Sequence, residues 1–285
     1  ITSIVNFSAG GGSDLAARAL CDKAAELMGC TITTTNVTGG SGTVGAAELA
    51  NEDPDGYTIG FVPTASMALT PLFVDGANYT VDDFDYICGF GQYGYGIVVN
   101  NDSEFKSMDD VIAAMKKGTL KFGITGYPQP FAMYELANQV GGSVEAVSYP
   151  STTDMITDVM GGFLDICVAD EASFAAYVRS GDVTLLAGCC EDRWISGPDV
   201  PTLLELGYDV KLEAYLAMVA PKGIDADKLA ILRDAFETAA QDEKFIEIMN
   251  NANQHVSFMT GEDYEAFMKE KAVEFKDLYA KYGTN

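Results

Sequence analysis

The N-terminal stretch Ile1-Thr2-Ser3-Ile4-Val5-Asn6-Phe7-Ser8-Ala9-Gly10-Gly11-Gly12-Ser13-Asp14 decides how the fold begins. Its first seven residues are mostly apolar or β-branched, which predicts a strand. The amphipathic stretch from Leu15 to Met28 predicts a helix that ends at Gly29. The glycines between them predict a loop whose backbone can approach a ligand closely, at a helix start with unpaired N–H groups. Asp14 is expected to cap that helix.

Strand and helix signals continue to alternate beyond this unit. Thr31–Val37 and Tyr57–Val62 predict two further strands, separated by a glycine-rich loop and a helix that ends near Asn51. An alternation of this kind predicts a parallel sheet with helices on its faces.

A second block of the same kind begins near Ile97. Further strands are predicted at 120–125, 146–148, 164–169, 183–188 and 213–219, and helices after Ser107, at 131–140, after Tyr149-Pro150-Ser151-Thr152, at 226–239 and at 261–281. We therefore predict an α/β fold with two lobes, each a mainly parallel sheet flanked by helices. Lobe 1 comprises 1–96 and 214–285, lobe 2 comprises 97–213, and two crossover hinges lie near 94–97 and 212–215.

The composition excludes several classes of protein. The chain has 285 residues, of which 48% are hydrophobic, so it is not intrinsically disordered. No apolar run reaches the ~18 residues that a membrane span needs. With 17 Lys and Arg against 42 Asp and Glu, the net charge of −25 argues against a nucleic-acid partner and against an anionic membrane surface.

Histidine and cysteine usage also limits the chemistry. A single histidine, His255, cannot build a His-based zinc site, and we expect no metal and no catalytic residue. The six cysteines contain no Cys-x-x-Cys motif. A disulfide between Cys21 and Cys30 is not expected, because Cys21 lies about 10 Å from the end of its predicted helix and a disulfide allows only ~7 Å between Cα atoms. We expect mostly free, buried thiols, which in an exported protein would indicate a reducing habitat.

The segment Gly40-Ser41-Gly42-Thr43-Val44-Gly45 matches the dinucleotide fingerprint G-x-G-x-x-G. The motif follows the second strand instead of the first, and the next strand ends without the acid that would bind a ribose. We therefore expect a loop that exposes backbone amides and no cofactor, and keep a nucleotide-dependent enzyme as an alternative.

Four segments, in this order, resemble the solute-binding receptors of tripartite tricarboxylate transporters, the Bug family. They are Phe7 to Arg18, the PDGYT motif at 54–58, the stretch from Tyr149 to Asp165 with its Gly161-Gly162 pair, and Arg193 followed by Pro198-Asp199-Val200-Pro201-Thr202. The resemblance extends over nearly the whole chain.

This resemblance implies a type II periplasmic-binding-protein (Venus-flytrap) fold with a carboxylated solute in the cleft between its lobes. It implies a monomeric, non-enzymatic protein that captures a small carboxylate, such as a di- or tricarboxylate or an acidic amino acid, and delivers it to the permease subunits of a membrane transporter. A ligand-sensing receptor for a signalling partner stays open as an alternative. We expect an exported protein, periplasmic or a cell-surface lipoprotein, whose leader or anchor is absent from this sequence.

The expected ligand contacts lie in loops that follow the strands of both lobes. In lobe 1 they are Ser8, Ala9, Gly10, Gly11, Gly12, Ser13, Asp14, Gly40, Ser41, Thr64, Ser66 and Tyr215, and in lobe 2 they are Thr125, Tyr127, Gln129, Tyr149, Ser151, Thr152 and Asp170. The sequence departs from the family pattern at 38–42, at 127–131, at Pro150-Ser151 and at Tyr215, which often is Trp. These departures fall in the expected ligand loops and leave the identity of the solute open.

Overall fold

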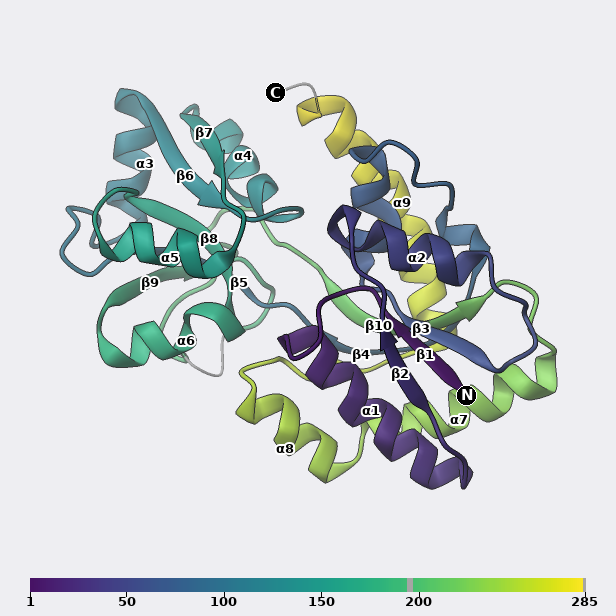
Figure 1. Ribbon diagram of the computed structural model, residues 1–285. Coiled ribbons are helices and arrows are strands. Elements are labelled where there is room, and N and C mark those ends of the chain that lie inside the picture. Colours follow the sequence, from purple (N-terminus) through teal and green to yellow (C-terminus); the bar gives the residue numbers. More distant parts are fainter. Residues whose placement is uncertain (194–196, 284–285) are drawn as a thin grey trace. The chain divides into compact units, whose positions relative to one another are not determined.

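A computed structural model describes residues 1–193 and 197–283, and its chain divides into two compact units (Figure 1). Unit 1 contains Ile1–Gln92 and the residues from Ala214 onward, and unit 2 contains Tyr93–Glu213. The boundary predicted after residue 96 falls a few residues later than this division, because β5 (Tyr95–Asn100) already pairs with the strands of unit 2. Each unit has its own sheet flanked by helices, which confirms the α/β class.

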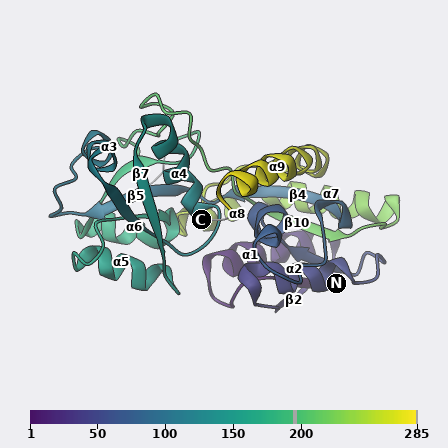
Figure 2. The same ribbon diagram turned by 90° about the horizontal axis from the view of Figure 1, so that it is seen from above.

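Unit 1 is built on a six-stranded sheet of order β11-β4-β10-β3-β1-β2. Its strands are β1 (Thr2–Val5), β2 (Thr33–Asn36), β3 (Thr58–Phe61), β4 (Phe84–Gln92), β10 (Tyr215–Pro221) and β11 (Met259–Thr260). One face carries α1 (Gly12–Met28), α7 (Ala226–Ala240) and α8 (Glu243–Asn251), and the other carries α2 (Thr43–Ala50) and α9 (Gly261–Tyr282) (Figure 1). Seen from above, α9 lies beside β4 (Figure 2). Short helical turns, η1 (Gly40–Gly42), η2 (Ala65–Leu69), η3 (Thr70–Leu72) and η4 (Val81–Asp83), complete the unit.

Unit 2 is built on a five-stranded sheet of order β7-β6-β8-β5-β9. Its remaining strands are β6 (Thr119–Ile124), β7 (Ser143–Ser148), β8 (Ile166–Asp170) and β9 (Val183–Gly188). Helices α3 (Met108–Lys117) and α4 (Gln129–Val140) cover one face, and α5 (Thr152–Met160) and α6 (Glu171–Ser180) cover the other. The helix predicted after Ser107 is α3, and Ser107 caps it in a capping box closed by Asp110.

Both sheets are mixed, so the prediction of mainly parallel sheets is wrong. In unit 1, β1, β2 and β3 are parallel, but β10 is antiparallel to both β3 and β4. The chain leaves unit 1 at the end of β4 and returns along β10 beside it, which makes these two strands antiparallel. In unit 2 the chain enters along β5, which is antiparallel to β8 and β9. Helices α6 and α8 were not predicted.

Aromatic side chains fill the core of unit 1. The rings of Phe61 and Phe90 lie 5.9 Å apart, as do those of Phe90 and Phe245 from α8, and all three side chains are fully buried. The core of unit 2 gathers residues such as Met155, Phe174 and Leu185. These cores pack against the sheets, from whose strand ends the loops of the candidate sites begin.

All six cysteines are free, and five of them are buried, as predicted; Cys30 is exposed. Burial raises the pKa of the Cys21 thiol to about 11, which keeps it protonated and unreactive at neutral pH. Among residues 1–193 and 197–283, no helix is long and apolar enough to cross a membrane.

Candidate functional site

The three parallel strands β1, β2 and β3 of unit 1 end at the same edge of the sheet. A loop follows each of them, and two of these loops are rich in glycine. Ligands of open α/β sheets bind outside the carboxyl ends of strands. This edge is therefore the candidate site of unit 1.

The first glycine loop ends in an uncapped helix start. Helix α1 begins at Gly12 with Gly11 at the N-cap position, where no side chain caps the helix. Ser8, Ala9, Gly10 and Gly11 are exposed. Within the described part of the chain, the backbone N–H groups of Gly12 and Asp14 have no acceptor. Unpaired N–H groups at the positive end of a helix dipole form a site for an anion.

The backbone conformation identifies which glycine the loop requires. Gly10 has φ +80°, a left-handed conformation that side chains rarely adopt, and a Cβ there would meet nothing within 4 Å. Gly11 has φ −75°, which any residue can adopt. The positive φ thus makes glycine necessary at position 10, whereas at position 12 a Cβ would come too close to the side chain of Gln254.

Asp14 holds this loop in place and does not cap the helix, contrary to the prediction. Its carboxylate is 3% exposed and accepts hydrogen bonds from the Gly10 N–H at 2.8 Å, from Arg18 Nε at 2.9 Å and from Asn36 Nδ2 at 2.8 Å. Burial alone would raise the pKa of Asp14, but the hydrogen bonds from Arg18, Gly10 and Asn36 outweigh it and lower the pKa. Because these groups occupy the carboxylate, Asp14 is a positioning residue that ties the loop to the end of β2.

The second glycine loop runs from Gly39 to Gly42 and is closed by hydrogen bonds within unit 1. Gly39, Gly40 and Gly42 have positive φ, and so does Ser41 at +53°. The carbonyl of Ser41 accepts from Ser66 Oγ at 3.3 Å, and that of Gly42 accepts from Asn6 Nδ2 at 3.0 Å. Exposed Gly40 and Ser41 therefore have a defined backbone conformation at the candidate site.

Packing explains the last glycine of the G-x-G-x-x-G segment. A Cβ on Gly45 would lie 2.5 Å from the carbonyl oxygen of Val37 and 2.9 Å from Cβ of Asn6. Glycine at this position lets α2 approach β1 closely. Packing therefore explains the last glycine of the motif, and no bound nucleotide is needed to account for it.

Three predicted contact residues lie in the interior of unit 1, behind these loops. Thr64 is fully buried, and its hydroxyl accepts from the Tyr215 N–H at 3.0 Å and bonds the hydroxyl of Tyr264 at 2.9 Å. Tyr215 is 8% exposed, with its ring 5.0 Å from that of Phe267. Ser66 is 2% exposed. In this structure they support the loops from within.

In unit 2, backbone N–H groups of the loop after β6 donate hydrogen bonds to a side chain of the same unit. The buried side chain of Gln129 accepts from the N–H groups of Thr125 at 2.6 Å and of Gly126 at 3.2 Å. The next peptide bond along, Tyr127–Pro128, is cis. Tyr127 is half-buried beside Phe131, with ring centroids 5.7 Å apart. These amides are therefore satisfied within the unit.

The loop after β7 carries a capped helix start. Ser151 is the N-cap of α5, and its hydroxyl accepts from the Asp154 N–H at 3.1 Å. The hydroxyl of Tyr149 donates to Asp158 Oδ2 at 2.9 Å. Burial and this bond to Asp158 raise the pKa of Tyr149. Thr152 is the first residue of α5, so only the start of its first turn offers backbone N–H groups.

Asp170 closes β8 and caps α6. Its carboxylate accepts from the N–H of Ser173 at 3.1 Å and from the hydroxyl of Ser173. Burial raises the pKa of Asp170, although the bonds from Ser173 oppose this shift. The carboxylate of Asp170 is thus used to cap α6.

Two side chains at the edge of unit 1 were not predicted as site residues. Gln254 is 4% exposed, and a Cβ on Gly12 would lie 2.7 Å from its Nε2 atom. The side-chain oxygens of Gln254 and Asn6 are buried without a hydrogen-bond partner among the described residues. Asn6 directly follows β1, a position that could have marked it, but no sequence motif includes Gln254.

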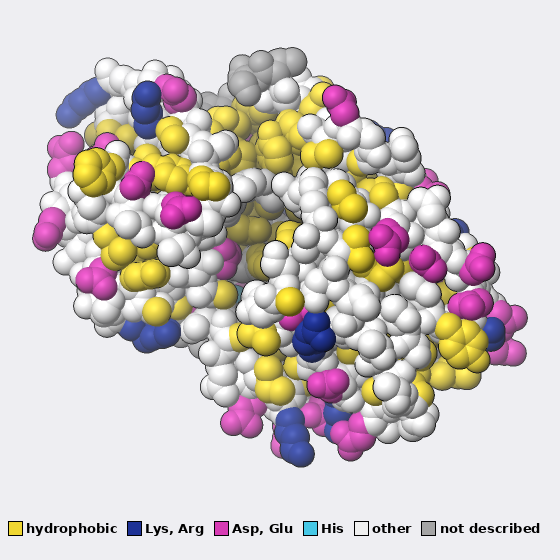
Figure 3. Space-filling model, viewed as in Figure 1, with side chains coloured by type: hydrophobic (Ala, Val, Ile, Leu, Met, Phe, Trp, Pro, Cys, Tyr) yellow, Lys and Arg dark blue, Asp and Glu magenta, His cyan; other side chains and the backbone are white. Residues whose placement is uncertain are grey.

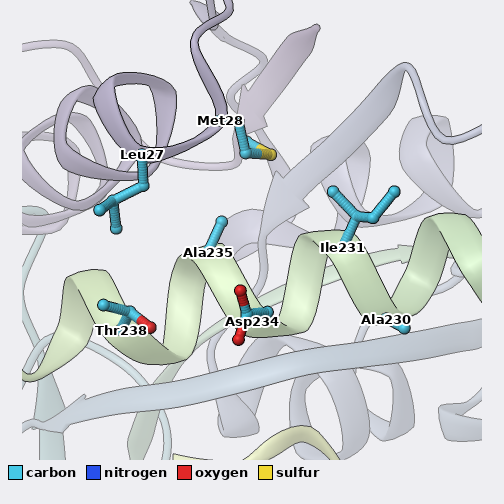
Figure 4. Close-up of a pocket in the computed structure, with 7 residues that line it drawn as sticks. All are labelled: Leu27, Met28, Ala230, Ile231, Asp234, Ala235 and Thr238. Carbon is cyan, nitrogen blue, oxygen red and sulfur yellow. The ribbon is translucent and has the colours of Figure 1, made fainter.

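Two surface grooves lie away from these loops. One, of about 490 Å³, lies between α1 and α7 and is lined by Leu27, Met28, Ala230, Ile231, Asp234, Ala235 and Thr238 (Figure 4). Leu27 and Met28 are at the carboxyl end of α1, so this groove is far from Gly12. The other, of about 440 Å³, contains Thr119 at the amino end of β6. Neither groove is at a carboxyl edge of a sheet.

Acidic side chains are spread over the visible face of the molecule and do not gather in one patch (Figure 3). The carboxylate nearest in sequence to the first glycine loop, Asp14, is paired with Arg18. The net charge of −25 therefore describes the surface as a whole and does not by itself define the electrostatics of the site.

Several solved structures share this fold over nearly the whole chain. A TctC solute-binding protein from Polaromonas superposes with a TM-score of 0.83 at 23% identity, over 99% of this chain and 98% of that chain. A Rhodopseudomonas palustris protein with adipate gives a TM-score of 0.85 at 18% identity, over 99% and 97% of the two chains. MatC from the same organism, with bound malate, gives 0.79 at 18%, over 97% of each chain. This chain therefore has the same fold as these solved proteins.

The sequence then gives the family. Residues 16–283 match the Tripartite tricarboxylate transporter family receptor, so the chain belongs to this family. A relative from Cupriavidus necator, the UPF0065 protein in the gbd 5′ region, is 30% identical over 99% of this chain and 87% of its own length. BugT of Bordetella pertussis is 27% identical over 87% of this chain and 78% of its own length. The predicted resemblance to the Bug family is thus confirmed.

Proposed function

We propose that this receptor captures a small organic acid, a di- or tricarboxylate or an acidic amino acid, and that the first glycine loop of unit 1 binds one of its carboxylates. The observation that carries this proposal is the uncapped start of α1. The N–H groups of Gly12 and Asp14 are without acceptors in the described residues, next to exposed Gly10 and Gly11. Hydrogen bonds from backbone N–H groups to a carboxylate are charge-assisted and short.

Asp14 supports this role from behind the loop. Its hydrogen bond with the Gly10 N–H and its ion pair with Arg18 fix the loop before a ligand arrives. A site that is ordered in advance loses less conformational entropy on binding. Two solved proteins with this fold, one with bound malate and one with adipate, support a carboxylate as the ligand.

In unit 2 we assign the second set of contacts to the loop around Tyr149, Ser151 and Thr152. The receptor would act as an exported monomer and deliver the acid to the permease subunits of a tripartite tricarboxylate-type transporter. The family to which the chain belongs supports this delivery step. A lipid anchor stays a prediction from the sequence.

A thermal-shift panel tests the function. A ligand that binds only the folded state stabilises it by about 2.7 kcal/mol at 100-fold excess over Kd, which corresponds to a rise in Tm of roughly 5–10 °C. We expect at least one of succinate, malate, citrate, adipate, aspartate and glutamate to produce such a rise, with calorimetry giving its Kd. Glucose and magnesium chloride serve as controls. A shift with these controls and none with the acids would contradict the proposal.

A further inference from the structure

We infer that Gln254 is a specificity-determining contact of the glycine-loop site and selects carboxylates that carry a hydroxyl or ammonium group. This inference rests on the proposed function and refines its substrate class. It starts from an unusual state of the Gln254 side chain, which is 4% exposed and whose Oε1 has no hydrogen-bond partner among the described residues.

Gln254 is held against the start of α1. The chain after α8 places its Nε2 atom 2.7 Å from the position that a Cβ on Gly12 would take. Its backbone N–H donates to the Met249 carbonyl at 3.0 Å, which anchors the residue to α8. Within the described part of the chain, its Oε1 atom has no hydrogen-bond partner. The carboxamide thus lies beside Gly12, the first residue of the helix whose start is proposed to bind a carboxylate.

A second unsatisfied acceptor lies at the same edge. Asn6 is 1% exposed, and its Nδ2 donates to the carbonyl of Gly42 at 3.0 Å. Since a carbonyl can only accept, this bond requires the Asn6 nitrogen to face Gly42, and Oδ1 of Asn6 therefore points away from that carbonyl. Oδ1 has no partner in the described residues. Both side chains thus carry an oxygen acceptor that lacks a donor, in the same unit and at the same edge as the helix start whose N–H groups lack acceptors.

This combination defines the chemistry of the matching ligand. A carboxylate satisfies N–H donors but cannot satisfy an acceptor, whereas a hydroxyl or ammonium group can donate to one. A buried polar group that stays unpaired is costly, so a ligand that pairs it is favoured over an analogue that does not. Hydroxy or amino acids are therefore expected to bind more tightly than unsubstituted acids of the same length.

The contrast with Gln129 indicates that this is a feature of the site and not of buried glutamine in this fold. Gln129 is equally buried, at 5%, but its carboxamide is bonded to Thr125 and Gly126. Replacing a satisfied buried amide should lower the Tm of the ligand-free protein. Replacing an unsatisfied one should leave the Tm unchanged or raise it.

The test measures matched pairs by calorimetry: malate and aspartate against succinate, and citrate against tricarballylate. For at least one pair we expect the wild-type protein to bind the substituted acid at least ~10-fold more tightly. We expect Gln254→Met to reduce that ratio to about twofold or less without lowering the Tm of the ligand-free protein, whereas Gln129→Met lowers the Tm. Gln139→Met, an exposed change in unit 2, should leave the ratio unchanged.

Two results would overturn the inference while leaving the proposed function intact: a wild-type ratio below about twofold in every pair whose members bind, or a ratio that survives in Gln254→Met. A lower Tm for ligand-free Gln254→Met, with the ratio retained, would likewise assign Gln254 a structural role. If none of these acids binds, the proposed function fails and this inference fails with it.

Discussion

Substituting Gly11 by aspartate should make α1 cap itself and block the proposed anion site. Gly11 is the N-cap, with φ −75° and ψ 165°, the extended geometry from which a side chain accepts an N–H of the first turn. The introduced carboxylate would accept from the N–H of residue 14 and place a negative charge at the helix start. It would compete for the same groups that bind the ligand.

The magnitude follows from the groups that the structure leaves open. Two first-turn N–H groups, those of Gly12 and Asp14, lack acceptors among the described residues. A hydrogen bond to a charged group contributes ~1.5–3 kcal/mol, so losing two of them costs at least ~3 kcal/mol of binding, or ~100-fold in Kd. The same change should stabilise the free protein by ~0.3–1 kcal/mol, since an acid at a helix N-terminus is favourable.

Calorimetry with the acid that gives the largest thermal shift, together with the Tm of the free protein, measures both effects. Gly118→Asp is the charge control, because it adds the same charge in unit 2 where a Cβ meets nothing within 4 Å. Gly11→Ala is the steric comparison, because its Cβ would lie 3.4 Å from the Ser8 carbonyl oxygen, an ordinary contact. A Kd for Gly11→Asp within threefold of the wild type would refute the assignment of the site to this helix start.

Three further substitutions test the supports of the site. The pKa of Asp14 is lower in the folded protein than in the unfolded chain, where it is near 3.8. The stability that this carboxylate contributes is therefore present above pH 3.8 and is lost as the pH falls through the lower folded value. Asp14→Asn should cost ~1–3 kcal/mol of unfolding free energy in urea at pH 7, and this difference from the wild type should shrink below pH 4. Gly45→Ala should lower the unfolding free energy by ~1–3 kcal/mol through overpacking, and an unchanged Tm would show that α2 can move away from β1. Thr64→Val should cost ~1–3 kcal/mol, because the Tyr215 N–H loses its acceptor, and a neutral result in the same assay would mean that water replaces the hydroxyl.

Local features of the fold were predictable because their causes are local in sequence. The capping box of Ser107 and Asp110 joins residues three apart, and the glycines before α1 mark the change from strand to helix. The mixed strand order was not predictable in this way. The pairing of β10 with β4 depends on where the chain returns after the whole of unit 2, and no local pattern near Tyr215 encodes that direction.

The roles of individual site residues depended even more on distant partners. Asp14 looked like a helix cap because an acid commonly stands there, but Asn36, from the end of β2, draws its carboxylate inward. Thr64 follows a strand, as a ligand contact would, yet it bonds Tyr264, which is 200 residues away in sequence. Sequence position therefore placed these residues at the carboxyl edge of the sheet, but it did not show which of their side chains face outward there.

The distribution of hydrogen bonds separates the loops of the two units. In unit 2, Gln129 accepts from the amides of Thr125 and Gly126, and Ser151 accepts from that of Asp154, so these amides have protein acceptors. In unit 1, the start of α1 has no side-chain cap. A carboxylate bound there gains hydrogen bonds that no protein group must give up.

Oriented dipoles act over short distances, whereas surface charges are screened beyond about 8 Å at physiological salt. A chain with a net charge of −25 can therefore bind an anion at a helix start whose nearest acid in sequence, Asp14, is already paired with Arg18.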